Sequence, residues 1–284
     1  MSLTKFYPYP AKKISLVGHD CAYIDEGRGT PMVFLHGFSV HLGCFAKNYP
    51  YFARHRRVIG LEYPGYYLSQ KKDAPYDIPF MARCVAELIE KLHLKQAVLV
   101  GSSMGGTIAL EAAIARPDLV SALVLAAPGG FSGRQPLMSR LIDIQLRLFP
   151  RKNVIAAMSR RLGQRVPTFF ADKAHPFIGE IIKGYEGMKT RDDYELWIMT
   201  LVMMARSLLR TDLRRRAREI VVPALIVWGD KDEVLPPAGA DLARRAMGDR
   251  ATVVTFPNVG HLPFIEEAKR FNKEVDGFLA SLGR

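Results

Sequence analysis

The sequence has few cysteines, and their arrangement suggests neither a disulfide framework nor a metal site. Its 284 residues include only Cys21, Cys44 and Cys84. They are odd in number and lack the C-x-x-C spacing of zinc and redox sites. We therefore expect reduced, mostly buried thiols in a cytoplasmic protein that carries no metal and no other cofactor.

Long apolar runs are also missing. No stretch approaches the roughly 18 apolar residues that span a bilayer, and the polar residues 1–13 lack the apolar core of a signal peptide. The sequence thus predicts no stable membrane insertion. Hydrophobic residues make up 49% of the chain and charged residues 24%, which is typical of a globular enzyme.

Acidic residues are scarce relative to basic ones. The chain has 28 Asp and Glu against 40 Lys and Arg, for a net charge of +12, and residues 131–219 alone hold 18 basic against 9 acidic side chains. Such a patch could meet nucleic acid, an acidic substrate or an anionic membrane surface. No nucleic-acid-binding motif accompanies it, so we expect no nucleic-acid partner and interpret the patch as a solvated basic face. Docking on anionic lipid remains the alternative.

Short runs, most of them rich in valine and leucine, recur along the chain and predict strands. They lie at residues 14–17, 22–25, 31–35, 57–61, 97–100, 122–127, 223–228 and 252–256. Most of them are separated by segments that we expect to be helical, at residues 41–53, 78–92, 104–116, 238–247 and 265–282. Strands that alternate with helices predict an α/β fold with a mostly parallel sheet.

The alternation stops between the sixth and seventh of these strands. Residues 131–219 are arginine-rich and helical in character, without strand-like runs. Ligands bind at the carboxyl edge of parallel sheets, so we interpret this stretch as a helical cap, or lid, over that edge. The core then consists of residues 1–130 and 220–284.

Ser103 lies at the junction of a predicted strand and helix, between Gly101 and Gly105. This G-x-S-x-G spacing is typical of a nucleophile elbow. A serine on so tight a turn crowds the positions two residues away, where only residues without bulk fit. Ser102 has bulky residues at those positions, so Ser103 is the candidate nucleophile. The geometry of a tight turn could also explain this pattern without any catalytic role. The presence of an acid, a base and oxyanion donors would favour the catalytic interpretation.

A catalytic serine needs an acid and a base, in the chain order Ser, acid, His. His261 follows the loop after the last predicted strand, at the same carboxyl edge as Ser103. Asp230 and Asp232 follow the preceding strand, and either carboxylate could orient the imidazole. The alternative for His261 is a hydrogen-bonded loop histidine.

A tetrahedral intermediate also needs two N–H donors. One would be the backbone amide of Met104, directly after the nucleophile. The other would be the amide of Phe38, in the loop that Gly37 allows to turn after the strand at residues 31–35. Phe38 as a core residue is the competing interpretation.

With these motifs the sequence resembles the α/β-hydrolase superfamily, in particular its cap-bearing bacterial esterases and C–C bond hydrolases. The resemblance covers nearly the whole chain and rests on His36-Gly37-Phe38, Gly101 to Gly106, Trp228 to Asp232 and Gly260-His261. It implies a mostly parallel eight-stranded sheet flanked by helices. It also implies Asp232 rather than Asp230 as the acid, and Phe38 and Met104 as oxyanion donors.

The sequence departs from this family pattern in places. Ser103 excludes the relatives with an aspartate nucleophile. Hydrolases of meta-cleavage products typically carry tryptophan after the catalytic histidine, whereas this chain has Leu262. Tyr66 and Tyr67 stand where small residues are usual in the loop after the fourth strand.

We therefore predict a serine hydrolase that cleaves carboxylic esters through an acyl-enzyme, with Ser103, Asp232 and His261 as its triad. The alternatives are a C–C hydrolase of meta-cleavage-type diketones and a ligand-binding relative without turnover. The partner would be a small ester with an apolar acyl or alcohol group, and a homodimer is possible.

We expect Trp197, Leu201 and Leu262 to form the substrate pocket. The helical spacing of the apolar residues around Trp197 equally fits the core of the cap.

Overall fold

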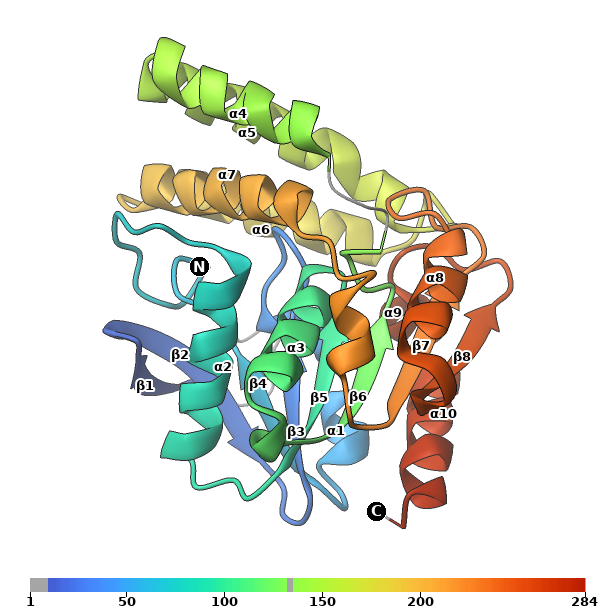
Figure 1. The fold of residues 1–284 in the computed structure, drawn as a ribbon. Helices are drawn as coiled ribbons and strands as arrows, with labels where there is room; N and C mark the ends of the chain where they lie inside the picture. The colour runs from blue at the N-terminus through green and yellow to red at the C-terminus, as the bar shows by residue number, and fades with distance from the viewer. Residues whose placement is uncertain (1–9, 132–134, 284) are drawn as a thin grey trace.

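The computed structural model describes residues 10–131 and 135–283. Residues 1–9, most of the segment in which we predicted no signal peptide, lie outside the described residues, as do residues 132–134 of the predicted cap. Eight strands form one sheet in the order β1-β2-β4-β3-β5-β6-β7-β8 (Figure 1). They are β1 (Lys12–Leu16), β2 (His19–Glu26), β3 (Pro31–Leu35), β4 (Arg57–Leu61), β5 (Ala97–Ser102), β6 (Val120–Ala126), β7 (Ala224–Gly229) and β8 (Ala251–Phe256).

One strand of the sheet, β2, runs in the direction opposite to all the others. β2 is antiparallel to both β1 and β4, and every other neighbouring pair is parallel. The eight-stranded, mostly parallel sheet confirms the predicted fold class. Its carboxyl edge is therefore shared by β3, β5, β7 and β8, the strands after which the predicted site residues fall.

Helices cover both faces of the sheet (Figure 1). One layer holds α2 (Ile78–Lys91), α3 (Met104–Ala115) and α8 (Ala238–Met247), and the other holds α1 (Tyr49–Phe52), α9 (Pro263–Glu266) and α10 (Ala268–Ser281). In the second layer Asn48 Nδ2 donates to Asn272 Oδ1 at 2.7 Å and Tyr51 OH donates to Asp276 Oδ2 at 2.7 Å. Short 3-10 helices are η2 (Leu42–Phe45), η3 (Pro117–Leu119), η4 (Val166–Phe169), η5 (Arg216–Glu219) and η6 (Gly248–Arg250).

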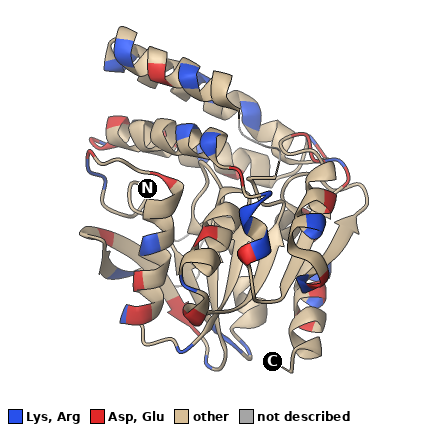
Figure 2. Cartoon of the chain, viewed as in Figure 1, with Lys and Arg blue, Asp and Glu red and all other residues tan. Residues whose placement is uncertain are grey.

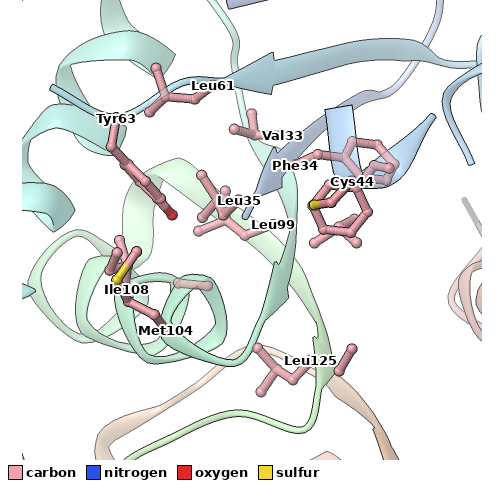
Figure 3. Packing of buried hydrophobic residues seen from close by; sticks show 14 of the residues in the cluster. Val33, Phe34, Leu35, Cys44, Leu61, Tyr63, Leu99, Met104, Ile108 and Leu125 are labelled. Carbon is pink, nitrogen blue, oxygen red and sulfur yellow. The ribbon is translucent and has the colours of Figure 1, made fainter. Parts of the chain in front are cut away.

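The core is built on both faces of the central strands. Successive side chains of a strand point to opposite faces, and β3 is buried on both. Figure 3 shows Phe34 beside Cys44 on one face, while Leu35 lies with Tyr63 and Met104 on the other. Strands buried in this way need continuous apolar runs, which is the pattern that the sequence shows.

Two of the predicted helices are interrupted in the structure. The segment 41–53 forms η2 and α1 instead of one helix. Pro50 has no N–H to donate, so it is tolerated only in the first turn of a helix and forces a new start there. The predicted helix at 265–282 begins earlier and is interrupted at Glu267, between α9 and α10.

Among the described residues, four α-helices lie between β6 and β7, and we call these four the inserted helices. They are α4 (Pro136–Leu148), α5 (Arg151–Arg165), α6 (Phe177–Lys189) and α7 (Tyr194–Arg210). They stack beyond the carboxyl edge of the sheet, with α7 next to the core and α4 outermost (Figure 1). None of the described helices is long and apolar enough to cross a membrane.

The three cysteines are free and buried, as predicted. Cys21 lies in β2, Cys44 in η2 and Cys84 in α2. Burial raises the pKa of Cys21 to about 12 and raises the pKa values of Cys44 and Cys84 above their ordinary range. In the part of the chain that the structure describes, no cluster of His, Cys, Asp and Glu side chains has the arrangement of a metal site.

A buried lysine attaches the inserted helices to the core. The Lys71 side chain is fully buried, and its Nζ donates to Tyr67 O at 2.8 Å and Ser69 O at 3.1 Å and contacts Asp193 Oδ2 at 3.0 Å. Arg191, and after it Lys71, lowers the pKa of Asp193 to about 2. Burial lowers the pKa of Lys71. The carboxylate thus stabilises an ammonium that would otherwise be buried without a counter-charge.

We expect D193N to lower the free energy of unfolding by about 2 kcal/mol at neutral pH. The folded-state pKa of Asp193 is depressed below its ordinary value of 3.8. The stabilisation is therefore complete above about pH 4 and is lost as the pH falls toward 2. Urea denaturation at pH 7 and pH 3 measures the difference, with D192N on the exposed neighbour as the control. A D193N effect of equal size at both pH values would contradict this account.

Candidate active site

Ser103 occupies a strained corner between β5 and α3. Its backbone has φ 51° and ψ −113°, a region that costs a non-glycine residue about 1–3 kcal/mol. Ser103 N donates to Ala126 O at 2.9 Å, and Gly129 N donates to Ser103 O at 3.2 Å. The end of β6 therefore holds the turn in place, while the Ser103 side chain stays partly exposed.

The two glycines of the G-x-S-x-G pattern permit close backbone packing. A Cβ at Gly105 would lie 2.0 Å from Leu35 O, and a Cβ at Gly101 would lie 2.5 Å from Gly105 O. Real Cβ atoms do not approach other atoms so closely, so only glycine fits either position. The contact at Gly105 also sets the start of α3 directly against the end of β3.

The structure pairs His261 with Asp232. His261 Nδ1 lies 2.7 Å from Asp232 Oδ2, and both side chains are buried. Asp232 Oδ1 accepts from Val234 N at 2.8 Å and Leu235 N at 2.9 Å, so the carboxylate has a fixed orientation. Asp230, the other candidate, accepts a hydrogen bond from the loop amide of residue 258 instead.

The two predicted oxyanion donors lie beside the elbow. Met104 N is the first amide of α3 and has no helical acceptor. Phe38 follows Gly37, at which a Cβ would be 3.5 Å from Ser103 Cβ. Within residues 10–131 and 135–283, neither the Phe38 amide nor the Met104 amide donates a hydrogen bond.

The loop that carries Phe38 rests on a buried polar pair. His36 Nε2 lies 3.0 Å from Glu62 Oε1, and both side chains are fully buried. Glu62 Oε2 also accepts from Leu42 N at 3.3 Å. The His36 side chain thus supports the geometry of this loop.

Ser103, Asp232 and His261 follow β5, β7 and β8, so the three predicted residues share one sheet edge. Among the described residues, no hydrogen bond joins Ser103 Oγ to His261. Hydrogen bonds of this kind are often long or misaligned in unliganded sites and tighten when substrate binds.

The His261 loop is held by the segment between α5 and α6, through contacts that the sequence did not predict. His261 N donates to Phe169 O at 2.9 Å. The Glu266 carboxylate accepts from Gly260 N through Oε1 and from Ala171 N through Oε2, both at 2.9 Å. Burial raises the pKa of Glu266. A Cβ at Gly260 would lie 2.7 Å from Ala171 N, so the two loops pack backbone against backbone.

The predicted pocket residues are all buried. Trp197 on α7 packs against Tyr67 and Tyr185, with ring centroids 5.4 and 6.0 Å away. Leu201 lies one turn further along α7, and Leu262 directly follows His261. Trp197 lines a cavity of about 260 Å³ among α5, α6 and α7.

Tyrosine hydroxyls join this region to the predicted oxyanion loop. Tyr185 OH lies 2.9 Å from Ser39 Oγ, and Tyr67 OH donates to Ser39 O at 3.1 Å. Tyr66 OH lies 3.4 Å from Met104 Sδ. The two tyrosines that replace small residues in the family pattern thus pack against the predicted oxyanion loop and the start of α3.

The fold is that of the α/β hydrolases. Residues 32–274 match the model of the alpha/beta hydrolase family, and the chain belongs to that family.

Relatives in sequence span several activities. The chain is 32% identical over 256 residues to the dihydrolipoyllysine-residue acetyltransferase component of an acetoin cleaving system of Pseudomonas putida. That match covers 88% of this chain but 64% of the relative, so the chain spans less than two thirds of that protein. It is 28% identical over 261 residues to a pimeloyl-[acyl-carrier protein] methyl ester esterase of Xanthomonas axonopodis, covering 90% of this chain and 97% of the relative.

Solved structures share the fold. An esterase from Exiguobacterium antarcticum superposes with a TM-score of 0.80 at 25% identity, covering 95% of this chain and 100% of that one. A meta-cleavage product hydrolase from Pseudomonas fluorescens superposes with a TM-score of 0.76 at 21% identity, covering 95% and 98%. The second likeness shows the fold alone.

The strain at Ser103 predicts opposite effects of glycine at two adjacent serines. S103G removes the Cβ that makes the corner unfavourable, so we expect it to be more stable than S103A by about 1 kcal/mol. Ser102 has an ordinary strand conformation, and S102G should be less stable than S102A. Chemical denaturation of the four variants measures both differences. Equal stability of S103G and S103A would show that the corner is not strained.

The Glu266 contacts predict a local effect on the His261 loop. E266A leaves two partly buried amides without their acceptor, which costs about 2 kcal/mol of stability in total. The amides of Gly260 and Ala171 should then exchange with solvent faster than in the parent chain, as amide hydrogen exchange reports. E267A on the exposed neighbour is the control, and unchanged exchange at both amides in E266A would refute the prediction.

Proposed function

We propose that this chain is a serine hydrolase that cleaves carboxylic esters. The observation that carries the proposal is the placement of Ser103. It lies on a strained elbow at the sheet edge that also bears the His261–Asp232 pair, with two unpaired backbone amides beside it. A hydrolytic serine site needs these parts. The esterases among the relatives and structural neighbours support the ester as substrate.

Each side chain has one role in the proposed reaction. His261 Nε2 takes the proton of Ser103 Oγ as the oxygen attacks the acyl carbon. Asp232 holds the Nδ1–H of His261 and stabilises the imidazolium that forms. His261 is positively charged only while it holds the transferred proton. The Asp232 carboxylate therefore stabilises the charged intermediate state more than the resting state.

The amides of Phe38 and Met104 would bind the oxyanion of the tetrahedral intermediate. Both donors are backbone groups fixed by β3 and α3, so they need no reorganisation during the reaction. Collapse of the intermediate passes the proton from His261 to the departing alcohol. A water molecule, deprotonated by His261, then releases the acid from Ser103 and restores the hydroxyl.

We also propose that residues 131–219 act as the cap of this site. Two observations support the assignment. The inserted helices lie beyond the carboxyl edge of the sheet (Figure 1), and residues 169–171, between α5 and α6, contact the His261 loop. Trp197, Leu201 and Leu262 are the proposed apolar contacts of the substrate, and their burial favours an apolar acyl or alcohol group. The free cysteines favour a cytoplasmic location.

Adjacent serines provide a matched test of the proposal. S103A should lower kcat for a short nitrophenyl ester by at least about 10³-fold, because the nucleophile is lost. S102A should retain activity, since the Ser102 hydroxyl is buried and points to no partner among the described residues. Steady-state kinetics on both variants measures the effect. Full activity of S103A would overturn the assignment.

Two further measurements separate the alternatives. A fluorophosphonate probe should label the parent chain but not S103A, whereas a ligand-binding relative without an activated serine would stay unlabelled in both. A vinylogous diketone from ring cleavage should be a poorer substrate than the ester. Faster turnover of the diketone would assign C–C bond hydrolysis instead.

A further inference from the structure

Apolar side chains are exposed mainly on one helix. Six of the nine exposed large hydrophobic residues among the described residues fall within positions 137–149, on and just after α4. Four of them repeat with the period of a helix face, at Leu137, Leu141, Ile144 and Leu148. We call these four the outer stripe. Leu137 and Leu148, at its two ends, are 70% and 74% exposed.

The opposite face of α4 is the one that packs on the protein. Ser139 is buried, and Ile142 and Leu146 pack against the core of the inserted helices. Asp143 forms ion pairs with Arg206 and Arg210 of α7. The orientation of α4 is thus fixed from its inner side, and the outer stripe is left exposed to solvent. Figure 1 shows that α4 itself lies beyond α7, on the side away from the sheet.

Basic residues surround the outer stripe. Residues 136–165 of α4 and α5 contain seven Lys and Arg against one Asp, and Figure 2 shows basic positions along α4. All seven basic side chains are exposed. The single Asp is the one paired with α7. Among the described residues, Arg140, Arg147, Arg160 and Arg161 form no ion pair, so their charge is available to an external partner.

We propose that this α4–α5 face docks on the surface of a membrane that contains anionic phospholipids. A helix with aliphatic residues along one line and arginines beside it lies in the interface between headgroups and acyl chains. The outer stripe would enter the acyl boundary, and the arginines would pair with phosphate groups, which guanidinium groups bind well. Docking of this kind needs no membrane-spanning helix.

Other occupants match the face less well. A second copy of the chain in a twofold dimer would bring the same arginines of both copies together, and like charges repel. A nucleic acid would match the charge. It would offer no apolar partner to four aliphatic side chains, because its contacts go largely to phosphates, sugars and base edges.

The proposed surface is independent of the proposed catalytic groups. None of the outer-stripe residues or flanking arginines belongs to the proposed triad, oxyanion hole or pocket. The same inserted chain continues through η4 into residues 169–171, which contact the His261 loop. Docking would therefore place the membrane on the side of the molecule where the candidate active site lies, without changing the chemistry of the site.

Vesicle cosedimentation of the full chain tests the proposal, with vesicles of phosphatidylglycerol and phosphatidylcholine compared with vesicles of phosphatidylcholine alone. We expect binding to the anionic vesicles only, weakened by salt because the attraction is screened. L141Q/L148Q and R140E/R147E should each reduce binding by at least about tenfold. All variants should hydrolyse a soluble ester at the parent rate if the proposed function holds. The sedimentation readout does not depend on activity.

Two variants at the opposite end of the molecule serve as matched controls. Val221 is 68% exposed in the segment before β7, and Lys95 is exposed in the turn before β5. V221Q and K95E should bind anionic vesicles like the parent chain. Equal binding to both vesicle types, or unchanged binding by the two double variants, would overturn the proposal. So would a dimer that L141Q/L148Q dissociates while vesicle binding stays unchanged.

Discussion

The candidate site depends on one contact between backbones, the approach of α3 to the end of β3. No side chain separates Gly105 from Leu35 O, so the start of α3 packs directly against the end of β3, from which the loop with Phe38 continues. The two candidate oxyanion donors, Phe38 N and Met104 N, come from segments far apart in the sequence. Their separation is set by this contact, and any side chain at position 105 would push α3 away from β3 and pull the donors apart.

The strands were the most predictable part of the fold. The predicted runs at 31–35 and 57–61 coincide with β3 and β4, because a strand buried on both faces needs an uninterrupted apolar sequence. Helices outside the inserted segment were predictable where one face is apolar, as for α2. The helix predictions were wrong where a residue cannot continue a helix despite a suitable apolar pattern. Pro50, which has no N–H to donate, forces a new helix start within 41–53.

The sequence predicted the sheet edge at which the candidate site lies, but not the contacts that hold its loops. Motif spacing placed Ser103 and His261 after strands of the same sheet edge, whereas the residues alone could not choose between Asp230 and Asp232. Glu266 was missed because a single carboxylate on a helix carries no local signal. Its role depends on two loops, one before it and one about 95 residues away, which only the folded chain brings together.

The three thiols lie in β2, η2 and α2, all in the first part of the core, and all of the inserted helices lack cysteine. All three are buried, which keeps reagents away from them and also raises their pKa values. A thiol reagent can therefore modify them only after the core around them opens. The rate of cysteine modification therefore reports how often the part of the core that holds the thiols opens. Rearrangements confined to the inserted helices would not change that rate.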